Sequence, residues 1–206
     1  MAARESRQFC GPMLILNGIE RVLERASPDD FGKSEAWIQE LLFKYPGLIP
    51  IDEIEPAFRG LIPIARELRT SHGLLDLFFL NAKGHITLIE TKLWSNPEAR
   101  RQVVAQIIDY ATEISRWSYM ELVSAIRNAN DSKDSDPLTS AARAAAGEEF
   151  NEADFTDTVS RNLFGGKFLL LIVGDGIHQG GGEHGGVLTA YSAARIYPWS
   201  SRTRSL

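Results

Sequence analysis

The sequence predicts an α/β protein with a mixed central sheet of four to five strands and helices on both faces. Three observations support this class. Residues 73–80 and 85–92 form two apolar runs separated by a turn, which is typical of a hairpin. Residues 167–173 form a third apolar run. Helical periodicity marks 34–44 and 97–117. Strands that are apolar on both faces are usually covered by helices on both sides.

The N-terminal third is expected to contain a short strand within 13–22, a turn at 27–30, and then a helix. Ser34 is a suitable N-cap for a helix that runs to Lys44, and Pro46 and Gly47 end it. The apolar residues of this helix fall on one stripe, which comprises Trp37, Ile38, Leu41, Leu42 and Tyr45.

The middle of the chain is expected to form three strands. Residues 61–68 are strand-like, and Pro63 favours an edge position for them. Residues 73–80 and 85–92 then form the hairpin. Its loop would be Ala82, Lys83 and Gly84, with Gly84 in the left-handed conformation that such loops need.

The remaining elements are predicted mainly as helices. Ser95 or Asn96 caps a helix with Pro97 at its first position. We expect one domain over 1–206, with its core in 34–117 and the strand 167–173, and mobile segments at 128–136 and 199–206. Further helices are expected at 119–127, 141–146, 154–163 and 187–194.

Composition narrows the functional class. The chain has 206 residues and a formal net charge of -5, which argues against a generally basic nucleic-acid coat. Its single cysteine, Cys10, excludes an internal disulfide and favours a reducing compartment. No apolar stretch approaches the roughly 20 residues of a spanning helix. We therefore expect a cytoplasmic protein that does not bind membranes.

The hairpin carries the most informative polar residues. With the three-residue loop, Asn81 faces His85, and Asp76 faces Glu90 on the neighbouring strand. Lys92 is two residues beyond Glu90 and so points to the same face. Two opposed carboxylates repel each other, and burying them costs free energy, unless a cation lies between them.

Magnesium suits such a site, because it prefers one or two carboxylates together with water and phosphate oxygens. A cation held by Asp76 and Glu90 could bind a phosphate oxygen and lower the pKa of a water molecule. Lys92 could position the attacking water or stabilise the charge that develops on phosphorus. The pattern indicates phosphodiester hydrolysis, with Mg²⁺ as cofactor and Mn²⁺ as a possible substitute. A structural cluster of ion pairs is the alternative.

Asp76 followed by Glu90-Thr91-Lys92 resembles the D…(D/E)xK signature of the PD-(D/E)xK nuclease superfamily. Residues 63–67, 73–76, 90–101 and 106–110 are also similar to uncharacterised bacterial members. Leu75 replaces the proline of the usual motif. The resemblance implies a restriction-endonuclease-like fold and metal-dependent hydrolysis of DNA.

The resemblance also implies helper residues. Members of the superfamily often supply a Glu from the first helix as a further ligand of the metal, and Glu35 suits this role better than Glu40. They often carry a Gln on the helix after the ExK strand, and Gln106 is the best candidate. Alternatively, Glu35 is a carboxylate stabilised by the helix dipole. Gln102 and Tyr110, which share a helix face with Gln106, could simply be half-exposed.

Basic residues cluster locally despite the acidic total. Between Arg59 and Arg101 there are seven Lys or Arg and four Asp or Glu. Arg66, Arg100 and Arg101 are candidates for contacts with a phosphate backbone, although scattered arginines are more often solvated surface. DNA is the expected partner, in a monomer or a homodimer. A catalytically silent binding or scaffolding module, or a nuclease that acts on RNA, are the alternatives.

Overall fold

A computed structural model describes residues 13–16, 19–22, 34–93, 98–174 and 189–191. Side chains are described for 34–93 and 101–174. The predicted caps Ser95 and Asn96 and the predicted mobile tail at 199–206 lie outside these residues. Within the described parts, every helix is too short or too polar to cross a lipid bilayer.

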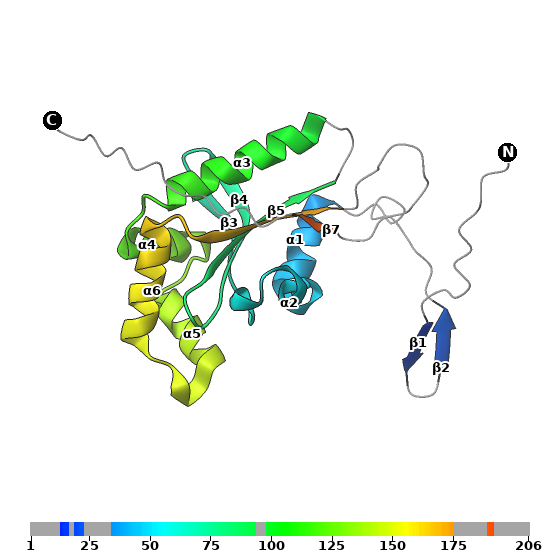
Figure 1. The fold of residues 1–206 in the computed structure, drawn as a ribbon, viewed down its shortest axis with the longest axis horizontal. Coiled ribbons are helices and arrows are strands. Elements are labelled where there is room, and N and C mark those ends of the chain that lie inside the picture. The colour runs from blue at the N-terminus through cyan, green and yellow to red at the C-terminus, as the bar shows by residue number, and fades with distance from the viewer. Residues whose placement is uncertain (1–12, 17–18, 23–33, 94–97, 175–188, 192–206) are drawn as a thin grey trace.

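The centre of the molecule is a five-stranded mixed sheet in the order β3-β4-β5-β6-β7 (Figure 1). Its strands pair antiparallel except for β5 and β6, which are parallel. Two short strands, β1 and β2, form a separate two-stranded sheet. The strand bounds are β1 Met13–Leu16, β2 Ile19–Val22, β3 Ile62–Thr70, β4 Gly73–Leu80, β5 Ile86–Lys92, β6 Phe168–Gly174 and β7 Thr189–Tyr191.

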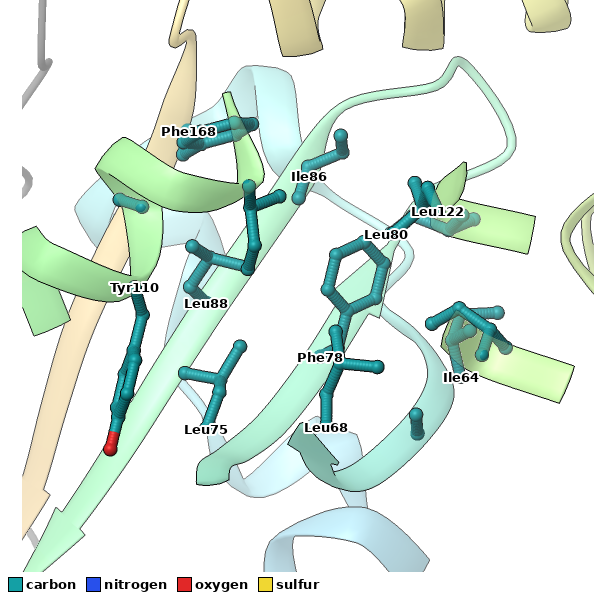
Figure 2. Close-up of a cluster of buried hydrophobic side chains, with 14 of the residues drawn as sticks. Ile64, Leu68, Leu75, Phe78, Leu80, Ile86, Leu88, Tyr110, Leu122 and Phe168 are labelled. Atoms are coloured by element: carbon teal, nitrogen blue, oxygen red, sulfur yellow. The ribbon is translucent and has the colours of Figure 1, made fainter. Parts of the chain in front are cut away.

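Helices cover both faces of the sheet, as predicted for the α/β class. On one face, α1 and α2 contribute buried residues that pack against Leu77, Phe79 and Ile89. On the other face, α3 to α6 pack against residues such as Phe78 and Leu88 (Figures 1 and 2). The α-helices are α1 Glu35–Lys44, α2 Ile51–Ile54, α3 Glu98–Ile114, α4 Tyr119–Ala129, α5 Pro137–Ala146 and α6 Glu152–Phe164, with single 3-10 turns at Pro46–Leu48, Pro56–Phe58 and Gly147–Glu149.

The first helix begins as its sequence predicts, because the Ser34 side chain accepts a hydrogen bond from the Trp37 backbone N–H. Its buried stripe is narrower than predicted. Trp37 is 37% exposed and Tyr45, which caps the C-terminus, is 51% exposed. Gln39, a polar residue outside the predicted stripe, is buried with Ile38 and Leu42.

The hairpin of β4 and β5 has the predicted register. Leu80 pairs with Ile86 and Leu77 pairs with Ile89, so that Asp76 and Glu90 occupy the next opposed positions. Gly84 has a φ of 81°, in the left-handed region that this loop requires. The chain of β3, with Pro63 at a register irregularity, lies at the edge of the sheet as expected.

The second half of the chain differs from the prediction in three ways. The core extends beyond 34–117 and 167–173, since Leu122, Leu138 and Phe155 are buried with it. Helix α5 begins earlier than expected, because Asp136 caps it and Pro137 occupies its first turn. The helix predicted at 187–194 is wrong, because 189–191 pair with β6 as a strand.

The segment 128–136 makes defined contacts with the rest of the fold. The Asn130 side chain donates a hydrogen bond of 2.7 Å to the carbonyl of Ile64 in the edge strand. Asp136 accepts a hydrogen bond from the Tyr119 hydroxyl, with 2.8 Å between the oxygens. These contacts fasten both ends of the segment to neighbouring elements.

Candidate metal centre

The candidate site lies where β4 and β5 end their pairing. The Asp76 carboxylate reaches across to β5, where its Oδ2 accepts hydrogen bonds from both the backbone N–H and the hydroxyl of Thr91, each 2.7 Å long. In return, the backbone N–H of Asp76 donates to the Glu90 carboxylate. At this end of the hairpin, hydrogen bonds between side chain and backbone take the place of the ladder between the two backbones. They hold the two acidic residues next to each other.

Glu90 is the more deeply buried of the two carboxylates. It is 5% exposed, and its Oε2 atom has no hydrogen-bond partner among the residues that the structure describes. Burial, with repulsion from Asp76 next in importance, raises the pKa of Glu90 to about 8. Burial likewise raises the pKa of Asp76, although its bonds to Thr91 oppose the rise. The site is therefore short of positive charge.

A matching distortion in two strands accompanies the position of Asp76. In a regular strand, residues an odd number of positions apart point to opposite faces. Leu75 and Phe78, however, belong to the same buried cluster (Figure 2), and so do Ala65 and Leu68 on β3. Glu67 is the residue opposite Asp76 by register, and its φ of 52° is unusual for a residue other than glycine.

Lys92 lies at the end of β5, with its ammonium bonded to α1. Its Nζ donates to Glu35 Oε1 over 2.6 Å, and the backbone N–H of Leu93 donates to the same oxygen over 3.1 Å. Both charges still act on Glu90: Lys92 lowers its pKa and Glu35 raises it. The structure therefore gathers Glu35, Asp76, Glu90 and Lys92 at one end of the sheet, with Lys92 paired to Glu35.

Gln39 joins this group from α1. It is 7% exposed, and its side chain forms a hydrogen bond with the Asp76 carboxylate that lowers the pKa of Asp76. Its Oε1 atom is buried without a partner among the described residues. Sequence reasoning missed this residue. The available signal was a glutamine between Ile38 and Leu42 on the inward side of a helix.

Gln106 and Tyr110 approach from the opposite face, on α3. The exposed Gln106 donates a hydrogen bond of 2.7 Å from its amide to the hydroxyl of Tyr110. Tyr110 is 1% exposed, and Glu90 and Asp76 add to the rise that burial causes in its pKa. Tyr110 is therefore a core residue close to the carboxylates, rather than half-exposed. Its hydroxyl would lie 3.0 Å from a Cβ at Gly73, so this glycine is needed for the close approach.

The candidate phosphate-binding arginines occupy two different elements. Arg66 is partly buried on the edge strand β3, and its Nε atom is buried without a partner among the described side chains. Arg101 is exposed on α3, as is Gln102. Arg100 is in the same helix, but its side chain lies outside the described ones. Contact of any of them with phosphate stays a prediction.

One observation indicates that the side chains of Asp76 and Glu90 suit a divalent cation. Glu90 Oε2 is a buried, unpaired carboxylate oxygen beside a second carboxylate, and a cation would satisfy both. Among the described residues, no three His, Cys, Asp or Glu side chains gather closely enough to enclose a metal. Two protein carboxylates with water and phosphate completing the shell is a magnesium arrangement, whereas a complete protein cage is not.

Comparison with known proteins assigns the chain to no family, because no family model, curated protein or solved structure matches it. The resemblance to the PD-(D/E)xK superfamily stays a prediction from the motif.

Proposed function

We propose that this chain is a metal-dependent nuclease that hydrolyses phosphodiester bonds in DNA. The observation that carries the proposal is the Glu90 carboxylate, which is 5% exposed, has an unpaired Oε2 and lies beside Asp76. Such a group destabilises a protein unless something neutralises it. A hard divalent cation, Mg²⁺ or Mn²⁺, is the partner that best matches two carboxylates.

Each residue has a role in this proposal. Asp76 and Glu90 hold the cation, which when bound would polarise a phosphate oxygen and make a water molecule more acidic. Lys92 orients the attacking water and stabilises charge on the phosphate. Glu35 holds the Lys92 ammonium through their 2.6 Å contact. Gln106 and Tyr110 form the wall on the α3 side, and Arg66, Arg100 and Arg101 meet the phosphate backbone.

Cleavage of plasmid and linear duplex DNA in Mg²⁺, Mn²⁺ and EDTA tests the proposal. Asp76→Asn removes a ligand charge while keeping the side-chain shape, and Lys92→Ala removes the ammonium. We expect each change to lower the cleavage rate by about 100-fold or more, because each removes charge stabilisation in the transition state. Labelled RNA in the same assay decides between the two nucleic acids.

The matched control is Lys83→Ala, which removes an exposed lysine at the turn of the same hairpin. It should cleave at the wild-type rate. The proposal fails if the Asp76 and Lys92 variants cut DNA as fast as the wild-type protein, or if cleavage persists in EDTA.

A second candidate is a catalytically silent module with the same fold. The observation that favours it is the ion pair between Lys92 and Glu35, which already neutralises the ammonium with a carboxylate other than Asp76 and Glu90. This module would bind a partner without needing a cation. It predicts the same melting temperature in Mg²⁺ and in EDTA, whereas a bound cation would raise it.

A further inference from the structure

Two arginines of the edge strand β3 have no charged partner. Arg66 is partly buried and Arg69 is exposed. Among the described residues, neither arginine forms an ion pair. The buried Nε atom of Arg66 also has no hydrogen-bond partner there. Because arginines are common on protein surfaces, their positions in the fold decide whether the two form a site.

The pairing of β3 with β4 places both arginines on the α1 face of the sheet. Arg66 pairs with Leu77, which belongs to the cluster that packs against α1. Leu68 belongs to the cluster on the opposite face, beneath α3. Since successive residues of a strand alternate between faces, Arg69 points to the same face as Arg66.

The distorted backbone at Glu67 is the reason that the two arginines share a face. Residues three positions apart on a regular strand point to opposite faces. Glu67 lies between Arg66 and Arg69, and its φ of 52° is in a region that few residues other than glycine adopt. In a regular strand, one of the two arginines would point into the apolar cluster on the α3 face. The strand thus keeps an unfavourable conformation that aligns two positive charges.

The aligned arginines lie beside the candidate metal centre. Arg69 pairs with Leu74, which precedes Asp76 by two residues on β4, so Arg69 lies at the same end of the sheet as the site. The Lys92 ammonium is on the same face, because it bonds to Glu35 of α1 over 2.6 Å. Neighbouring strands are about 4.8 Å apart, so β3 lies about 10 Å from β5, which is about three nucleotides along a DNA strand.

We propose that Arg66 and Arg69 act as a pair that binds the phosphate backbone of the nucleic acid next to the cleavage site. The inference rests on the proposed function, to which it adds Arg69 and a role for the backbone at Glu67. A guanidinium stays charged and presents its donors in a fixed fork, which matches phosphate oxygens. Contacts of this kind position the nucleic acid and favour no base sequence.

The test is the affinity for a fluorescein-labelled DNA duplex, measured by anisotropy in EDTA at several salt concentrations. Each phosphate contact contributes about 0.9 to the steepness with which log affinity falls against log salt. Arg69→Ala should bind more weakly and reduce this steepness by about 1. Arg69→Lys keeps the charge and should keep the steepness. Since Arg69 is exposed, both variants should melt at the wild-type temperature.

Arg116→Ala is the control, since it removes an exposed arginine that follows α3. It should bind with the wild-type affinity and salt dependence. If the wild-type protein binds the duplex and Arg69→Ala matches it in both, the arginine pair is wrong while the proposed function stands. If the wild-type protein binds no DNA in EDTA, the pair is also wrong, and cleavage in Mg²⁺ decides the proposed function separately.

Two variants of Glu67 test the role of the backbone. Glu67→Gly and Glu67→Val remove the same negative charge, but only glycine adopts the left-handed conformation without strain. Glu67→Val should therefore bind the duplex more weakly than Glu67→Gly. Equal affinities would show that the distortion does not align the arginines.

Discussion

The two ends of the β4–β5 hairpin differ in how completely their buried polar side chains are hydrogen-bonded. At the turn, Asn81 is 3% exposed, and both ends of its amide are fully used. Its Nδ2 donates to the carbonyls of Ala57 and Arg59 at 3.0 and 3.1 Å. Its Oδ1 accepts from the backbone N–H groups of Lys83 and His85 at 3.1 and 3.0 Å.

At the open end, Glu90 is about as deeply buried, at 5% exposed, but it is poorly satisfied. Its Oε2 has no partner among the described residues, and Asp76, an acid, is its neighbour. The turn shows that this hairpin can satisfy a buried polar side chain completely. The difference shows that Asn81 serves the fold, and it supports the proposal that Glu90 is kept for a ligand.

The largest expected effect on stability comes from removing the Asn81 side chain, whose hydrogen bonds are all satisfied. Asn81→Ala leaves two carbonyls and two backbone N–H groups without their partner. We expect it to lower the free energy of unfolding by about 2–4 kcal/mol, since each lost bond to a buried group costs about 1 kcal/mol. Urea denaturation followed by circular dichroism measures this change.

Asn81→Asp sharpens the interpretation. It keeps the acceptor for Lys83 and His85 but loses the donor to Ala57 and Arg59, so it should lose a smaller part of the stability. If Asn81→Ala unfolds at the wild-type urea concentration, the contrast between the two ends of the hairpin is wrong.

The next largest effect on stability comes from the Glu90 carboxyl group and depends on pH. Folding raises the pKa of Glu90 from 4.5 to about 8, so the folded protein holds a proton that the unfolded chain releases. Metal-free protein should therefore lose stability as pH rises from about 4.5 to 8. Glu90→Gln removes this titration and should raise the free energy of unfolding at pH 8 by up to about 4 kcal/mol, at about 1.4 kcal/mol for each pKa unit.

At pH 4.5 the two proteins should have nearly equal stability, because Glu90 is then protonated in the folded state. Urea denaturation in EDTA at both pH values measures the two differences. A variant that is less stable than wild type at pH 8 would show that the Glu90 carboxylate stabilises the fold without a cation.

The smallest expected effect lies on the edge strand, opposite Asp76. Glu67 is exposed and has a φ of 52°, a conformation that glycine adopts without strain. Glu67→Gly should leave stability unchanged or raise it by up to about 1 kcal/mol. Glu67→Val should lower it, because a β-branched residue tolerates this conformation poorly.

Thermal melting of the two variants checks the direction of each change. If Glu67→Gly is clearly less stable than Glu67→Val, the left-handed backbone at this position is not what shapes the strand next to Asp76.

Local chemistry made the hairpin predictable from the sequence. The loop length and Gly84 fix the register, and the register places Asp76 opposite Glu90. The helix that begins at Ser34 was predictable for a similar reason, because a cap is read from adjacent residues.

Features that depend on distant residues were not predictable. The ion pair between Lys92 and Glu35 joins residues that are 57 positions apart, and no local pattern encodes it. The sequence predicts a helix at 187–194, but 189–191 form a strand, because pairing with β6 decides their conformation. The role of Thr91, the variable residue of the ExK motif, depends on where Asp76 points.

The central claim is that Asp76 and Glu90 hold a divalent cation, and melting at pH 8 in EDTA and in Mg²⁺ tests it most directly. Mg²⁺ should raise the melting temperature of the wild-type protein and should leave Asp76→Asn and Glu90→Gln unchanged, because only a ligand bound to the folded state stabilises it. An equal rise in all three proteins, or no rise in the wild-type protein, would contradict the claim.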